Sequence, residues 1–269
     1  MKQVIPKLIA FAQDRAMLAG AGVTLRSIVM FPVRRRLSKT EIQIALRNGV
    51  SIRAPSMEPL LEIFREVWVD RRYMPVGFRV PRGHAIIDIG AHVGTFTLCA
   101  AAENPEARVI ALEPSALVCE FLRRNVAAAG KTNVTILECA CGGRSGEATL
   151  YGRGVEAMNS LYDVDSYGSS FCALTRVPVI SLDDLFERLE VRNCGLLKLD
   201  CEGAEYDILL NASPATLVKV GCISMEYHIG LNSHTPRELE GNLNSRGFRV
   251  ECGPLLDDEA GFLYARRID

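Results

Sequence analysis

The chain has 269 residues, of which 48% are hydrophobic and 23% are charged, and its formal net charge is −1 at pH 7. A chain of this length can bury a large core, and this composition is ordinary for a globular protein. A net charge so close to zero provides no basic field that would attract nucleic acid, so no nucleic-acid partner is expected.

Two features bear on the cell compartment. Residues 1–32 are mildly apolar but are interrupted by charged residues such as Lys7, Asp14 and Arg26, which predicts neither a membrane span nor a signal peptide. Several of the nine cysteines lie in apolar segments, and none forms a Cys-x-x-Cys pair. We interpret them as buried, reduced thiols and expect a cytoplasmic protein without stable membrane insertion.

Residues 1–80 are predicted to form an N-terminal extension, with a helix over 41–46 and a strand over 63–69. The main domain, 81–269, alternates strands and helices. Strands are expected at 85–89, 108–112, 134–140, 195–200 and 220–227, and helices at 94–102, 115–129, 182–189, 204–210 and 236–245. Two β segments, 147–151 and 177–180, flank a polar loop at 152–175, and 248–252 pairs with 262–266 as a terminal hairpin. This order predicts an α/β fold: a mostly parallel sheet with helices on both faces and an antiparallel C-terminal hairpin.

The turn after the first strand of the main domain suggests a cofactor. An apolar run ends at Asp88, and Gly90 and Gly94 follow, four residues apart. This Asp-x-Gly-x-x-x-Gly spacing differs from the Gly-x-Gly-x-x-Gly turn that cradles a dinucleotide pyrophosphate. It suits a cofactor without phosphates, such as S-adenosylmethionine. The carboxylate of Asp88 would accept a hydrogen bond from the ammonium group of its methionine part. The alternative is an ordinary strand–helix turn with an acid near a helix N-terminus.

The next strand ends in Glu113 and Pro114, 23 residues after Gly90. An acid at this position is suited to accept hydrogen bonds from both hydroxyls of a ribose, and Pro114 can begin the following helix. The two motifs together therefore favour a cofactor that carries a nucleoside.

Charged residues also follow the last two parallel strands. Alternation places Lys198, Asp200 and Glu202 on one side of the chain, and charges in so apolar a strand must be paired or belong to a site. A simple Lys–Asp pair at the sheet end is the alternative. His228 falls just past the following strand, at the same edge of the sheet, which makes it a candidate base, although a lone histidine is usually structural.

These motifs resemble the FkbM-type class I S-adenosylmethionine-dependent methyltransferases. The similar segments, over about residues 60–265, are 87–94, 112–114, 182–185, 197–205 and 226–228. Lys-x-Asp-x-Glu-Gly-Ala-Glu is the most specific of them, while His92 stands where the family usually has Asn. The resemblance implies a Rossmann-like, seven-stranded fold and methylation of a hydroxyl on a small molecule or sugar. Together with the motifs above, the resemblance implies that the following residues bind the cofactor: Asp88, Gly90, Ala91, Gly94, Glu113, Pro114, Ala140 and Asp200.

An aliphatic hydroxyl must lose its proton during methylation. We expect His228 or Asp200 to take that proton, with Lys198 and Glu202 tuning the pair, in a site without a metal. As an alternative, Asp200, Glu202 and His228 could ligate a divalent cation that polarises the hydroxyl.

Other functions compete with this prediction. One is a nucleic-acid or protein methyltransferase. Another is a nicotinamide-dependent oxidoreductase, which would need a third glycine in the turn. The last is a non-catalytic nucleotide-binding module, which would not need charged residues at the strand ends. We expect the loop at 152–175 to act as a substrate lid, helped by the N-terminal extension, which could instead form a homodimer contact.

Overall fold

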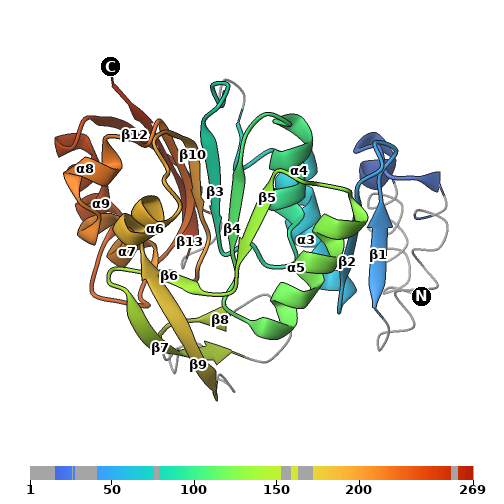
Figure 1. Cartoon of the computed structure of the whole chain (residues 1–269), viewed down its shortest axis with the longest axis horizontal. Coiled ribbons are helices and arrows are strands. Elements are labelled where there is room, and N and C mark those ends of the chain that lie inside the picture. Colours follow the sequence, from blue (N-terminus) through green and yellow to red (C-terminus); the bar gives the residue numbers. More distant parts are fainter. Residues whose placement is uncertain are drawn as a thin grey trace, which may run out of the picture.

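A computed structural model of the chain describes residues 16–25, 27, 41–75, 79–152, 159–162, 172–255 and 260–268. Its central sheet has seven strands in the order β12-β13-β11-β10-β3-β4-β5 (Figure 1). The parallel strands are β3 (Ala85–Ile89), β4 (Val109–Leu112), β5 (Val134–Leu137), β10 (Cys194–Leu199) and β11 (Cys222–His228), and the antiparallel pair is β12 (Phe248–Leu255) and β13 (Ala260–Arg267). The predicted sheet and its terminal hairpin are confirmed.

Helices cover both faces of this sheet (Figure 1). One face carries α4 (Thr95–Glu103) and α5 (Ala116–Ala128), and the other carries α6 (Leu182–Arg188), α7 (Glu205–Asn211), α8 (Pro214–Leu217) and α9 (Pro236–Ser245). Successive strand residues serve opposite faces: Ile86 packs with Phe96 of α4, whereas Ile87 packs with Leu185 of α6. Because both faces are covered, the parallel strands are mostly apolar, and the few charged residues in them stand out for this reason.

Two predictions for the N-terminal extension are wrong. Residues 41–46, predicted as a helix, contain strand β1 (Ile42–Ala45), which pairs with β2 (Ser51–Ala54). Ile42 and Ile44 are both buried, which is the two-residue period of a strand. Residues 63–69, predicted as a strand, lie in helix α3 (Met57–Phe64) and the π-helix η1 (Arg65–Val69). Their buried residues recur at helical spacing, as Leu60, Phe64 and Val67.

A second, smaller sheet lies beside the main one, in the order β6-β9-β7-β8. Its strands are β6 (Ala140–Gly142), β7 (Gly146–Gly152), β8 (Asn159–Ser160) and β9 (Cys172–Ser181). The predicted strand 134–140 therefore divides between two sheets. The predicted loop 152–175 is shortened by three of these strands, and its positions 153–158 and 163–171 lie outside the described residues.

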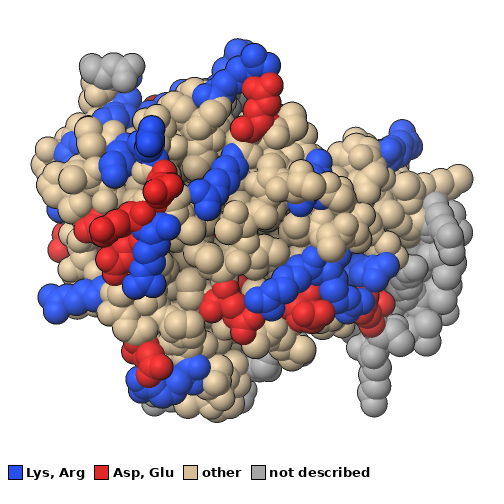
Figure 2. Space-filling model, in the orientation of Figure 1, with Lys and Arg blue, Asp and Glu red and all other residues tan. Residues whose placement is uncertain are grey.

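The surface, the cysteines and the helices add three findings. Basic and acidic side chains are interspersed on the face in Figure 2, without a large area of one sign. All nine cysteines are free thiols. Within the described residues, no helix is long and apolar enough to cross a membrane.

Candidate active site at the strand ends

A cavity of about 600 Å³ opens at the carboxyl ends of the central strands. It lies where β3 and β10 are neighbours and the strand order reverses, which is where doubly wound sheets bind ligands. Of the predicted site residues, the cavity is lined by Gly90, Ala91, Glu113, Pro114, Ala140, Lys198, Asp200, Glu202 and His228. Asp88 and Gly94 are not part of the lining.

The glycines of the first turn bring protein segments together. Gly90 and Gly94 have φ values of 76° and 91°, in the region that favours glycine. A Cβ on Gly90 would lie 1.7 Å from the carbonyl oxygen of Asp200, and one on Gly94 would lie 2.6 Å from Leu122 Cδ1. The missing side chain at Gly90 therefore lets the ends of β3 and β10 touch, which shapes the floor of the cavity.

Lys198 and Asp88 form a buried ion pair between β10 and β3, where they are register partners. Lys198 Nζ lies 3.0 Å from Asp88 Oδ1 and donates to the Gly90 carbonyl at 2.8 Å, while Thr97 Oγ1 donates to Asp88 Oδ2 at 2.5 Å. Burial disfavours the ammonium, but Asp88 and Asp200 outweigh it and raise the pKa of Lys198. The ammonium of Lys198 therefore stays charged, and Asp88 faces Lys198 and Thr97 rather than the cavity.

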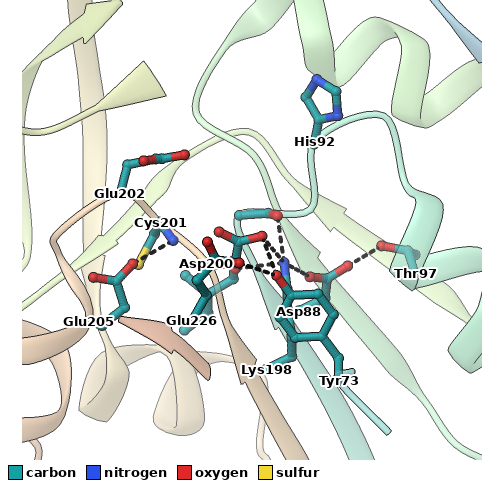
Figure 3. A network of polar contacts seen from close by, with 12 residues as sticks. Tyr73, Asp88, His92, Thr97, Lys198, Asp200, Cys201, Glu202, Glu205 and Glu226 are labelled. Atoms are coloured by element: carbon teal, nitrogen blue, oxygen red, sulfur yellow. Dashed lines mark hydrogen bonds and ion pairs between the residues drawn. The ribbon is translucent and has the colours of Figure 1, made fainter. Parts of the chain in front are cut away.

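Tyr73 of the N-terminal extension reaches two carboxyl groups at the strand ends (Figure 3). Its hydroxyl lies 2.9 Å from Asp200 Oδ2 and 3.1 Å from Glu226 Oε2. A phenol has one proton to donate, so it serves one carboxylate at a time. Burial and the nearby Asp200 raise the pKa of Glu226 to about 8. We refer to Asp200, Tyr73 and Glu226 as the proton-sharing unit.

His228, the last residue of β11, is surrounded by carboxylates. Its Nδ1 lies 3.3 Å from Glu205 Oε1, and its Nε2 lies 3.2 Å from Glu202 Oε2 and 3.7 Å from Glu226 Oε1. Burial by itself would lower the pKa of the imidazole. The nearby carboxylates of Glu205 and Glu202 outweigh this effect and raise the pKa to about 10. The ring is therefore protonated at neutral pH in the ligand-free chain and has no free nitrogen to act as a base.

Glu205 organises the turn between β10 and α7. It is fully buried, and its two oxygens accept from the backbone N–H groups of Cys201 (2.8 Å) and Gly203 (2.9 Å). These bonds hold Glu202 at a φ of 54°. The last glutamate of the Lys-x-Asp-x-Glu-Gly-Ala-Glu motif thus positions its neighbours, a role that the motif contains but that the sequence analysis did not assign.

Glu113 connects the end of β4 to the first turn. Its Oε2 accepts from the His92 N–H at 3.0 Å, and its Oε1 accepts from the Ser115 N–H at 2.9 Å. Burial raises the pKa of Glu113 to about 7, although both N–H groups oppose this. Because each carboxylate oxygen has a second lone pair, Glu113 can still accept hydrogen bonds from a ligand in the cavity.

His92, the departure from the family pattern, lies apart from the charged cluster (Figure 3). It has a φ of 50°, and its two ring nitrogens have no hydrogen-bond partner among the described residues. Burial lowers its pKa to about 4, so the ring is neutral.

The N-terminal extension supplies one wall of the cavity. Glu66 and Val67 of η1 line it, as do Arg72 and Tyr73, and π-helical turns often occur at functional sites. Arg72 donates to Glu66 at 2.9 Å, while burial raises the pKa of Glu66 to about 7. The sequence analysis found none of these four residues, since no motif marks them. A role of the extension in a homodimer stays a prediction.

The comparisons with known proteins agree with this geometry. Residues 88–250, more than half of the chain, match the family model described as the methyltransferase FkbM domain. The chain is thus a methyltransferase by class. It belongs to the FkbM family, as the resemblance of its motifs indicated.

Three relatives illustrate the range of this similarity. The chain is 25% identical to the 31-O-demethyl-FK506 methyltransferase FkbM of Streptomyces tacrolimicus, over 69% of this chain and 81% of that protein. It is 28% identical to the hexuronic acid methyltransferase AglP of Haloferax volcanii, over 67% and 69% respectively. It is 25% identical to the AMB antimetabolite synthetase AmbE of Pseudomonas aeruginosa over 90% of this chain, but spans only 13% of that protein.

Proposed function

We propose that the chain transfers the methyl group of S-adenosylmethionine to a hydroxyl of a small molecule or sugar. The observation that carries this proposal is one cavity lined both by the Gly90 turn with Glu113 and by the proton-sharing unit. The names of two relatives support it, since one is a methyltransferase of 31-O-demethyl-FK506 and another of a hexuronic acid.

The donor end of the cavity fits the proposed cofactor. Glu113 has free lone pairs for ribose hydroxyls, Pro114 and Ala140 offer apolar surface for an adenine, and the Gly90–Ala91 backbone borders the space for the methionine part. S-adenosylmethionine, when bound, supplies an activated methyl group on a sulfonium, so the protein mainly has to position the acceptor. Asp88 and Gly94 act behind this surface, by holding Lys198 and the helix after the turn.

The acceptor hydroxyl needs a group that takes its proton. As the oxygen attacks the methyl carbon, the carbon–sulfur bond breaks, its electron pair stays on sulfur, and the hydroxyl proton leaves. The two predicted bases are His228 and Asp200. His228 does not suit this role, because both of its ring nitrogens face carboxylates. The Asp200 side chain is 30% exposed and lines the cavity. We therefore assign the proton to Asp200 within the proton-sharing unit.

Ligand binding separates this proposal from its rivals. We expect S-adenosylmethionine and its demethylated product to raise the melting temperature of the chain, through binding linkage, and NAD and ATP to leave it unchanged. Stabilisation by NAD alone would favour an oxidoreductase, and stabilisation by none of the four would contradict the proposal.

Turnover then tests the acceptor site. A panel of hydroxyl-bearing sugars, hexuronic acids and larger alcohols is incubated with cofactor that carries a labelled methyl group. We expect D200N to bind the cofactor normally and to lose most of the transfer. The matched control E147Q changes an exposed glutamate whose ion-pair partner among the described residues is Arg176, and it should transfer at the wild-type rate. Full activity of D200N would remove Asp200 from the proton-accepting role.

We also propose that the protein works in the cytoplasm on a small-molecule substrate. Nine free thiols, of which Cys99, Cys119, Cys141 and Cys194 are buried, support a reducing compartment. Thiol titration of the denatured protein, prepared without reductant, should find all nine. A lower number would indicate disulfides and contradict this assignment.

A further inference from the structure

Carboxyl groups predominate at the acceptor end of the cavity. Three carboxyl groups, Asp200, Glu202 and Glu226, approach one imidazole, His228, at the cavity surface. Lys198 lies 3.7 Å from Asp200 but is closer to the fully buried Asp88, at 3.0 Å. Among the described residues, no other Lys or Arg forms an ion pair with any of the three.

The spacing of these groups suits a single metal ion. Asp200, Glu202 and His228 each offer a ligand atom, and the three atoms lie within 4.8 Å of one another. A six-coordinate ion with bonds of about 2.1 Å holds its ligands about 3–4 Å apart, so small rotations of the exposed carboxylates close the set. The side chains of Asp200 and Glu202 are 30% and 21% exposed, so both have space on the cavity side for these rotations.

A residue outside this set fixes the histidine in the orientation of a metal ligand. Glu205 is held by two backbone N–H groups and faces His228 Nδ1 at 3.3 Å. Metal-binding histidines usually donate one ring N–H to such a carboxylate, which leaves the other nitrogen for the ion. Here the other nitrogen, Nε2, is the one that faces Glu202 and Glu226, and an ion bound to it would displace the Nε2 proton into solvent.

We propose that Asp200, Glu202 and His228 bind one divalent cation of the Mn²⁺ type, which holds and polarises the acceptor hydroxyl. A set of two carboxylates and one imidazole suits Mn²⁺ better than Mg²⁺, which prefers oxygen ligands alone. Three protein ligands leave the remaining positions for water and for the hydroxyl. Because the hydroxyl comes from the proposed function, the role of the cation rests on that function.

The chemical step remains balanced with the cation present. Coordination would lower the pKa of the hydroxyl, and its proton would pass to the oxygen of Asp200 that does not bind the cation, in agreement with the role assigned to Asp200 under the proposed function. The oxygen then bonds to the methyl carbon while the carbon–sulfur electron pair stays on sulfur. Asp200 in this arrangement orients the cation, and Tyr73 holds Asp200 and Glu226 together.

Binding is tested on the full chain without substrate. The protein is freed of metal with a chelator and titrated with Mn²⁺, and the free ion is followed by electron paramagnetic resonance. We expect one site per chain, weakened at least about tenfold in E202Q and in H228N. The matched control is H234A: His234 also lies near two carboxylates, Asp207 at 3.6 Å and Glu238 at 3.1 Å, but outside the cavity lining. It should leave the site unchanged.

Each outcome decides the inference. The proposal is overturned if the wild type has no Mn²⁺ site, or if the site persists in both E202Q and H228N. It is also overturned if H234A loses the site, because the ion would then bind at the surface near His234. Cofactor binding, measured by calorimetry with the chelator present, tests the proposed function separately. If the cofactor binds and methyl transfer is undiminished without metal, the cation is refuted while the proposed function stands.

Discussion

Replacing Gly90 by alanine tests whether the contact between the ends of β3 and β10 shapes the site. The new Cβ would lie 1.7 Å from the Asp200 carbonyl oxygen, whereas real Cβ atoms essentially never approach closer than 3.0 Å. One of the two backbones must therefore move by at least about 1.3 Å. Alanine at positive φ costs about 1 kcal/mol, and overpacking adds about 1–3 kcal/mol. We expect the free energy of unfolding to fall by about 2–4 kcal/mol.

Gly83 provides the matched control. Its φ is 75°, against 76° at Gly90, and a Cβ there would meet nothing within 4 Å. G83A should therefore lose only the backbone cost, about 1 kcal/mol, in urea unfolding. Because Asp200 moves with its backbone, G90A should also lose cofactor affinity and G83A should keep it. Equal stability and equal affinity of the two variants would refute the reasoning.

Three further predictions address the charged groups around the cavity. K198M should lower the free energy of unfolding by about 3–5 kcal/mol, because it leaves Asp88 buried without a cation. If urea unfolding shows a smaller loss than the same substitution at an exposed lysine, this prediction is contradicted. Y73F removes a hydrogen bond worth about 1.5–3 kcal/mol, so kcat should fall about 10- to 100-fold with an unchanged KM for the cofactor; an unchanged kcat would exclude Tyr73 from the mechanism. The pKa values of Glu66 and Glu113 are raised to about 7, so the folded chain holds these protons more tightly than the unfolded chain. Their contribution to stability is complete below about pH 4.5 and is lost as the pH rises to about 7. E66Q should reduce this dependence, and an identical pH profile of its unfolding free energy would count against the assignment.

Much of the main domain could be predicted because its signals are local. Apolar runs bounded by Gly, Pro and acids locate the parallel strands, and Pro236–Ser245 was predicted as a helix with the bounds that the structure gives it. In the extension the same reasoning failed. Ile42 and Ile44 alternate as in a strand, but the four-residue β1 is too short for its period to exclude a helix.

The candidate site divides in the same way. Parallel strands end at one edge of the sheet, so Glu113, Asp200 and His228 could be placed together from the strand pattern alone. Their partners could not be placed. Tyr73 is 127 residues from Asp200 in the chain, and it reaches the strand ends only because the extension folds back over the sheet.

The sequence by itself determined the family, the sheet and the edge at which the charged residues gather, because these follow from periodicity and from the order of strands. Only the tertiary structure decided what each charge does. It pairs Asp88 with Lys198, encloses His228 among carboxylates, and leaves Asp200 and Glu202 at the cavity. The reason is that pairing and burial depend on side chains brought together from distant segments, and a carboxylate has one chemistry in water and another beside a buried ammonium.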